Sequence, residues 1–159
     1  MITLDCVSES DLWAAHPEME AIAERALAQA AASCGLSLLP GAEVALLLVD
    51  DMRMRSINKQ WREKDKPTNV LSFPAVPVSK IAHAPFLGDI VLACETVERE
   101  AADEDKTFDD HAAHLVVHGF LHLIGHDHMN DEEAELMEGL ETRILAELGI
   151  ADPYADAGH

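Results

Sequence analysis

The sequence is poor in aromatic residues, cysteine and positive charge, and each shortage excludes a class of protein. Two Trp, one Tyr and four Phe among 159 residues predict an aliphatic core. The three cysteines, Cys6, Cys34 and Cys94, lie far apart, which argues against a disulfide framework and favours a reducing cytoplasm. No apolar run approaches the roughly 20 residues that span a bilayer, and the N-terminus has no basic segment, so we expect neither a membrane span nor a signal peptide.

The balance of charge disfavours nucleic-acid binding by the chain as a whole, because 30 acids against 11 bases leave a net charge of −19. The bases, however, are concentrated. Six of them form what we call the basic strip: Arg53, Arg55, Lys59, Arg62, Lys64 and Lys66. Only Glu63 and Asp65 oppose them within that stretch. The strip is either a solvated helix face or a surface that holds a phosphate backbone.

The pattern of apolar residues predicts one α+β domain over residues 1–159. Alternation at residues 2–6 and short apolar runs at 44–49, 70–73 and 87–93 predict four strands. Helical periodicity predicts about five helices, over residues 17–34, 51–64, 94–105, 109–124 and 131–148, with a loop at 75–85. This order of elements implies a mixed four-stranded sheet packed with helices.

Some details of burial follow from the same pattern. The unbroken run at 44–49 predicts a central strand buried on both faces. In the helix after it, we expect Met54, Ile57 and Trp61 to point inward and the bases outward. The last helix has an apolar stripe that consists of Leu136, Met137, Leu140, Ile144 and Leu148.

Six of the nine histidines lie between residues 111 and 128, and their spacing predicts a metal site. His118 and His122 are one helical turn apart, and Gly125 allows the chain to fold back and bring His128 near them. These positions match the ligand spacing of the zincin motif H-E-x-x-H-x-x-G-x-x-H. Three neutral imidazoles are a common ligand set of catalytic zinc, with the fourth position left to water. We therefore expect a zincin-like metal helix with one zinc ion at His118, His122 and His128.

The residue after the first histidine differs from the zincin pattern. Zincin proteases have a glutamate there as general base, and this chain has Gly119. An ordinary peptidase mechanism is therefore weakened. A zinc-bound water with a pKa near 7 supplies the nucleophile without a carboxylate, or phosphate oxygens of the substrate share the proton transfer.

Two long motifs carry a resemblance to a known family. His118–His128 matches H-G-x-L-H-L-x-G-[YF]-D-H except for His126 at the aromatic position, and Arg62–Pro74 contains the whole of R-x-K-D-x-P-T-[DN]-V-L-S-F-P. The stretch Leu87–Ile90 adds L-G-D-I in the expected order. Over about residues 40–148 the sequence resembles the bacterial rRNA maturation endoribonuclease family, YbeY.

The resemblance implies a single-strand-acting, metal-dependent endoribonuclease of the cytoplasm, active in 16S rRNA 3′-end maturation and small-subunit quality control. The implied partners are rRNA and the small ribosomal subunit, with a ribosomal protein or an assembly GTPase, and neither DNA nor a membrane. The implied catalytic residues are Arg62, His118, His122 and His128, and the cofactor is one zinc ion. Two alternatives stay open: a zinc-dependent peptidase or amide hydrolase, and a non-enzymatic ribosome-assembly factor with a structural metal.

The neighbouring polar residues have less specific roles. Asp127 either caps the turn or orients a ligand imidazole. His111 and His114 are expected to pack or to lie outside the ligand set. Ser72 is expected to form a hydrogen bond within the strand region, and Asp89 to be structural.

Overall fold

The computed structural model describes residues 2–127 and 129–154. The strands are β1 (Thr3–Ser8), β2 (Glu43–Val49), β3 (Val70–Pro74) and β4 (Phe86–Ala93). The α-helices are α1 (Met19–Ser33), α2 (Asp51–Arg62), α3 (Cys94–Asp103), α4 (Phe108–Leu123) and α5 (Asp131–Glu147), with 3₁₀ helices η1 (Asp11–Ala15) and η2 (Val78–His83). The predicted α+β fold is confirmed. The two 3₁₀ helices were not predicted, and η2 lies within the expected loop.

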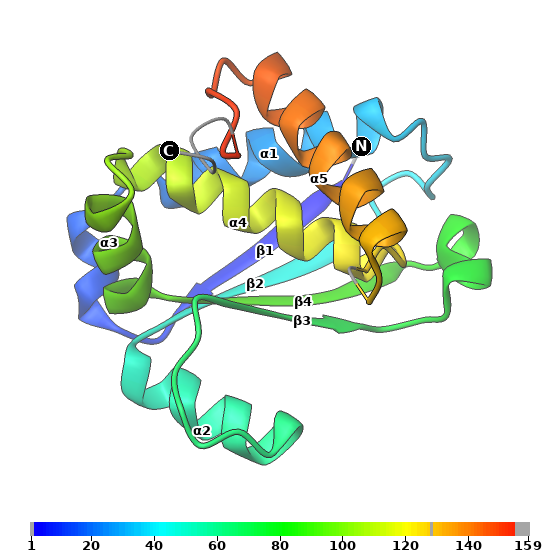
Figure 1. The fold of residues 1–159 in the computed structure, drawn as a ribbon. Coiled ribbons are helices and arrows are strands. Elements are labelled where there is room, and N and C mark those ends of the chain that lie inside the picture. Colours follow the sequence, from blue (N-terminus) through cyan, green and yellow to red (C-terminus); the bar gives the residue numbers. More distant parts are fainter. Residues whose placement is uncertain (1, 128, 155–159) are drawn as a thin grey trace.

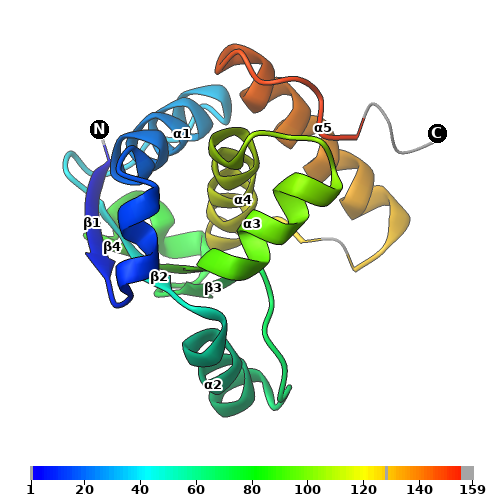
Figure 2. The same ribbon diagram turned by 90° about the vertical axis from the view of Figure 1, so that its left-hand side faces the viewer.

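The four strands form one mixed sheet in the order β1-β2-β4-β3. β1, β2 and β4 run parallel, and β3 pairs antiparallel with β4 at one edge. Helices α1, α4 and α5 lie on one side of the sheet, and α2 lies on the other (Figures 1 and 2). The edge strand β3 therefore lies between α4 and α2. No helix in the described parts of the chain is long and apolar enough to cross a membrane.

Helix α4 packs closely on the sheet because a glycine faces β3 and β4. A Cβ atom at Gly119 would lie 3.0 Å from Oγ of Ser72 and 3.1 Å from Cγ2 of Ile90. Ser72 donates a hydrogen bond of 3.1 Å to the carbonyl oxygen of Gly119, so its hydroxyl bonds to α4 and not within the strand region as expected. The close approach brings the C-terminal half of α4 beside the edge strand.

The prediction that β2 is buried on both faces is wrong. Ala45 and Leu47 are only half-buried, whereas Val44, Leu46 and Leu48 on the other face are buried. The reason lies in the coverage of the second face. Helix α2 packs over the end of the sheet near Val49, as part of a small apolar cluster, and leaves the remainder of that face less covered.

Two predicted core residues are exposed. Trp61 is 65% exposed and Leu136 is 58% exposed, whereas Met54 and Ile57 of α2 are buried as expected. Trp61 lies in the last turn of α2, where it contacts the partly buried ring of Phe73 on the edge strand. In α5, the inward arc is occupied by the buried residues Met137, Leu140, Glu141, Ile144 and Leu145, so Leu136 faces away from the core.

Candidate active site

A cleft of about 650 Å³ lies between the C-terminal half of α4, the edge strand β3 and the segment that follows α2. It brings the two sequence motifs together. Its lining residues include Arg62, Lys64, Lys66, Thr68, Asn69, Ser72, His118, His122, Gly125, His126, Asp127 and Met129. Two walls of this cleft have distinct chemistry. We call His118 and His122 the histidine wall, and Arg62, Lys64 and Lys66 the basic wall.

The two imidazoles of the histidine wall converge. Nε2 of His118 lies 3.2 Å from Nε2 of His122. Two nitrogens bound at 2.0–2.1 Å to one tetrahedral ion are about 3.3 Å apart, so the pair fits a shared metal ion. Gly125, with a φ of 102°, permits the return of the chain after α4. The third predicted ligand, His128, lies outside the described residues.

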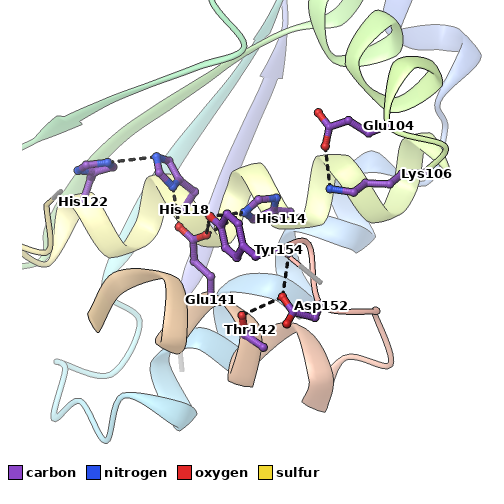
Figure 3. Close-up of polar contacts among 9 residues, drawn as sticks. All are labelled: Glu104, Lys106, His114, His118, His122, Glu141, Thr142, Asp152 and Tyr154. Atoms are coloured by element: carbon purple, nitrogen blue, oxygen red, sulfur yellow. Dashed lines mark hydrogen bonds and ion pairs between the residues drawn. The ribbon is translucent and has the colours of Figure 1, made fainter. Parts of the chain in front are cut away.

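A buried carboxylate orients the first of these imidazoles (Figure 3). Glu141 of α5 is fully buried. Its Oε1 lies 2.6 Å from Nδ1 of His118, and its Oε2 lies 2.8 Å from Nε2 of His114. The hydroxyl of Tyr154 donates a further hydrogen bond to Oε2. Because Nδ1 of His118 is engaged by Glu141, Nε2 is the nitrogen that faces His122 and an ion.

The electrostatics of this network keep the carboxylate ionised. Burial alone would raise the pKa of Glu141, but hydrogen bonds from His114, His118 and Tyr154 outweigh it and lower the pKa to about 2. An ionised carboxylate can only accept hydrogen bonds, so both histidines donate to it. Burial, together with the neighbouring Glu141, raises the pKa of the Tyr154 phenol, which therefore stays protonated and also donates.

Sequence reasoning missed Glu141. The one available signal was a charged residue within the apolar stripe of the last helix, between Leu140 and Ile144. A glutamate seldom lies fully buried unless it is paired. Its partners could not be read from the sequence, because they come from another helix and from the C-terminal segment.

His111 and His114, which we call the outer histidines, lie along a second, smaller cavity of about 210 Å³. His111 is buried, and its Nε2 lies 2.9 Å from Oε1 of Glu100. Nδ2 of Asn69 donates to the same carboxylate oxygen at 2.9 Å. His114 also lines this cavity and contacts Glu141. Neither outer histidine lines the main cleft.

The basic wall is positioned by the end of α2. Asp50 caps the start of this helix by accepting a hydrogen bond of 2.8 Å from the backbone N–H of Arg53. The helix ends at Arg62, and Glu63 then adopts a left-handed conformation with a φ of 59°. Nδ2 of the buried Asn58 donates to the carbonyl oxygen of Lys66 at 2.9 Å and ties the following loop to the helix.

The structure divides the basic strip into two halves. Outside the cleft, Arg53 pairs with Glu9 at 3.3 Å, and Arg55 and Lys59 pair with Asp65 at 2.6 and 3.9 Å. Arg62, Lys64 and Lys66 line the cleft, and among the described residues no carboxylate forms an ion pair with them. Only this second half of the strip offers uncompensated positive charge beside the histidines.

Four other positions from the sequence analysis can be placed. His126 and Asp127 both line the cleft, and burial lowers the pKa of the His126 imidazole. The two roles considered for Asp127 remain predictions. Gly119 points at the sheet, where Ser72 and Ile90 leave no room for a glutamate, so this position cannot supply the zincin general base. Asp89 pairs with Phe73 in the sheet and does not line the cleft.

Comparisons with known proteins agree with these motifs. Residues 7–149 match the family described as Endoribonuclease YbeY. Proteins named Endoribonuclease YbeY from Allorhizobium ampelinum and Bradyrhizobium diazoefficiens are 55% and 56% identical to this chain. Both alignments cover 92% of this chain, and they cover 91% and 82% of the respective relatives. A solution structure of TM1509 from Thermotoga maritima shares the fold, with a TM-score of 0.58, 23% identity and 99% coverage of both chains.

Proposed function

The chain belongs to the endoribonuclease YbeY family and is a nuclease that hydrolyses RNA, and we propose that the reaction takes place in the cleft between α4 and the end of α2. One observation carries this proposal. Converging imidazoles and three cations without carboxylate partners among the described residues line the same cleft. Phosphodiester hydrolysis needs both a group that activates the nucleophile and a positive charge near the phosphate.

The donor set fits one zinc ion, which His118, His122 and His128 would hold. Bound there, zinc acts as a Lewis acid and lowers the pKa of water, which makes hydroxide available at neutral pH. Glu141 fixes the tautomer of His118, so that Nε2 is the nitrogen that would bind the ion. His114 and Tyr154 hold Glu141 in place in turn.

The basic wall would bind the substrate. Arg62 can form a bidentate contact with two phosphate oxygens and stabilise the charge that develops during attack at phosphorus. Lys64 and Lys66, on the loop tied down by Asn58, would hold the neighbouring phosphates. With these roles, Arg62, His118, His122 and His128 are the catalytic residues.

The resemblance of both motifs to the family supports a cellular role in 16S rRNA 3′-end maturation and small-subunit quality control, in the cytoplasm. The substrate is single-stranded rRNA within the small ribosomal subunit. The net charge of −19 restricts favourable RNA contact to the cleft, so a ribosomal protein or an assembly GTPase would contribute to tight binding.

The test compares zinc-loaded and metal-stripped protein on a single-stranded RNA that contains the 3′ end of precursor 16S rRNA, with casein as a parallel substrate. The proposal predicts defined internal RNA cuts only with zinc and no casein turnover. Equal RNA cleavage without metal would overturn the metal mechanism. Casein hydrolysis would favour the peptidase, and tight metal binding with no cleavage of RNA or of small subunits would favour the non-enzymatic assembly factor.

A further inference from the structure

Trp61 is exposed in a way that its position on α2 does not explain. Ile57 and Met54, one and two turns earlier, are 5% and 0% exposed, whereas Trp61 is 65% exposed. A large aromatic side chain is usually well buried, so an open indole indicates a surface with a binding role.

Trp61 does not itself line the cleft, but it lies next to residues that do. Its neighbour Arg62 and the residue one turn before, Asn58, both line the cleft. Trp61 touches Phe73 of β3 edge to face, with ring centroids 6.3 Å apart and an interplanar angle of 63°. Ser72 and Pro74, on either side of Phe73, also line the cleft. Phe73 itself packs with the α2 cluster on the other face of β3, so the aromatic pair lies beside the cleft, next to the basic wall, without lining it.

The surroundings specify the chemistry of an occupant. Arg62 and Lys64 offer positive charge next to a flat, uncovered aromatic ring. Proteins that bind single-stranded nucleic acid combine a positive groove for the backbone with aromatic side chains on which unpaired bases stack. A single-stranded nucleic acid matches both the positive charge and the exposed aromatic ring, because its backbone is a polyanion and its bases are flat rings.

We propose that Trp61 is a stacking platform for an unpaired base of the RNA strand whose phosphate is held by Arg62. This inference rests on the proposed function. It adds a subsite that binds a strand only where a base is present and unpaired. A base inside a duplex has both faces covered, so the platform favours single-stranded RNA. Phe73 supports the indole from the side of the sheet.

Fluorescence can test this directly, because the chain has only two tryptophans. Trp13 is 4% exposed, and its Nε1 donates to the carbonyl oxygen of Val49 at 2.9 Å, so its emission should not respond to a ligand. The zinc-loaded protein is titrated with an uncleavable 2′-O-methyl oligoribonucleotide of about eight nucleotides, with its duplex, and with an abasic strand of equal length.

The expected results separate the base from the phosphate. The single strand quenches Trp61 emission, and the duplex and the abasic strand do not. Trp61→Ala weakens binding of the single strand about 10-fold and leaves the affinity for the abasic strand unchanged. Trp61→Phe restores most of the lost affinity for the single strand. The control Met52→Ala, at a residue 79% exposed on the same helix, changes neither affinity.

Two results would overturn the proposal in different ways. If Trp61→Ala binds the single strand as the wild type does, while Arg62→Ala loses affinity for both strands, the platform is refuted and the proposed function stands. If the wild type binds no strand, in the presence or absence of small ribosomal subunits, both proposals fail. If Trp61→Ala loses as much affinity for the abasic strand as for the single strand, the indole has a structural role and does not stack on a base.

Discussion

The histidine wall and the basic wall of the cleft are built in opposite ways. The imidazole of His118 is held by a hydrogen bond to the fully buried Glu141, which also binds His114 and Tyr154. Arg62, on the other side, is the last residue of α2, and among the described residues no carboxylate forms an ion pair with it. A metal ion needs ligand atoms at fixed positions, whereas a phosphate backbone needs uncompensated charge.

This contrast implies that substitutions in the two walls affect different properties of the protein. Damage to the histidine wall should appear first in metal binding, and damage to the basic wall should appear first in RNA cleavage or RNA affinity. The following predictions are ordered by the size of the expected effect.

Replacement of Arg62 should have the largest effect on rate. Arg62→Ala is expected to reduce RNA cleavage roughly 10²–10³-fold, by about 2.7–4 kcal/mol, by analogy with the loss of one oxyanion-hole donor. Arg62→Lys should recover only part, because an ammonium cannot form the bidentate contact. Single-turnover cleavage assays measure the difference. The matched control is Arg55→Ala, because the guanidinium of Arg55 pairs with Asp65 outside the cleft, so its removal should not change the cleavage rate. Cleavage by Arg62→Ala at the wild-type rate would remove the basic wall from the mechanism.

Removal of the metal should destabilise the chain without unfolding it. A ligand that binds the folded state alone contributes about 2.7 kcal/mol at a free concentration 100 times its Kd. For a domain of this size, chelation should therefore lower Tm by roughly 5–10 °C, as calorimetry can measure. The aliphatic core does not depend on the ion, so the fold should survive. A chelated chain that is unfolded at room temperature would make the metal structural.

Neutralising Glu141 should weaken the metal site from a distance. Glu141→Gln keeps the shape but leaves one acceptor oxygen for two histidines, and loss of such a partner costs about 10–100-fold in metal affinity. Competition with a chromogenic chelator gives the affinity. Tyr154→Phe serves as a control, since it removes one hydrogen bond to Glu141 and leaves the hydrogen bonds between Glu141 and both histidines in place, and it should have a smaller effect. Unchanged affinity in a correctly folded Glu141→Gln protein would refute the positioning role.

The lysines of the basic wall should have the smallest effect. Lys64→Ala and Lys66→Ala are each expected to weaken RNA binding modestly and to reduce the slope of log K against log salt by about 0.7, the value for one phosphate contact on a single strand. Filter binding at several salt concentrations measures the slope. Lys59→Ala, at a residue that pairs with Asp65, should leave the slope unchanged. If all three variants behave alike, the division of the basic strip has no functional meaning.

Local features of the site could be predicted from the sequence. The convergence of His118 and His122 follows from helical geometry, and the end of the helix before Pro67 follows from the restriction that proline imposes. The mixed sheet and the five α-helices follow from periodicity. What depends on packing between distant elements could not be predicted. Glu141 joins the site only because α5 packs on α4, and the contact of the exposed Trp61 with Phe73 depends on how α2 lies against β3.

The central claim is that one cleft combines a metal-binding wall with a separate phosphate-binding wall. The most direct test is the metal content of purified His122→Ala and Arg62→Ala, measured beside the wild type by mass spectrometry of the metal. The account predicts no zinc in His122→Ala, one zinc per chain in Arg62→Ala and in the wild type, and RNA cleavage that is strongly reduced in both variants relative to the wild type. A full complement of zinc in a folded His122→Ala protein, or its loss in Arg62→Ala, would contradict the account.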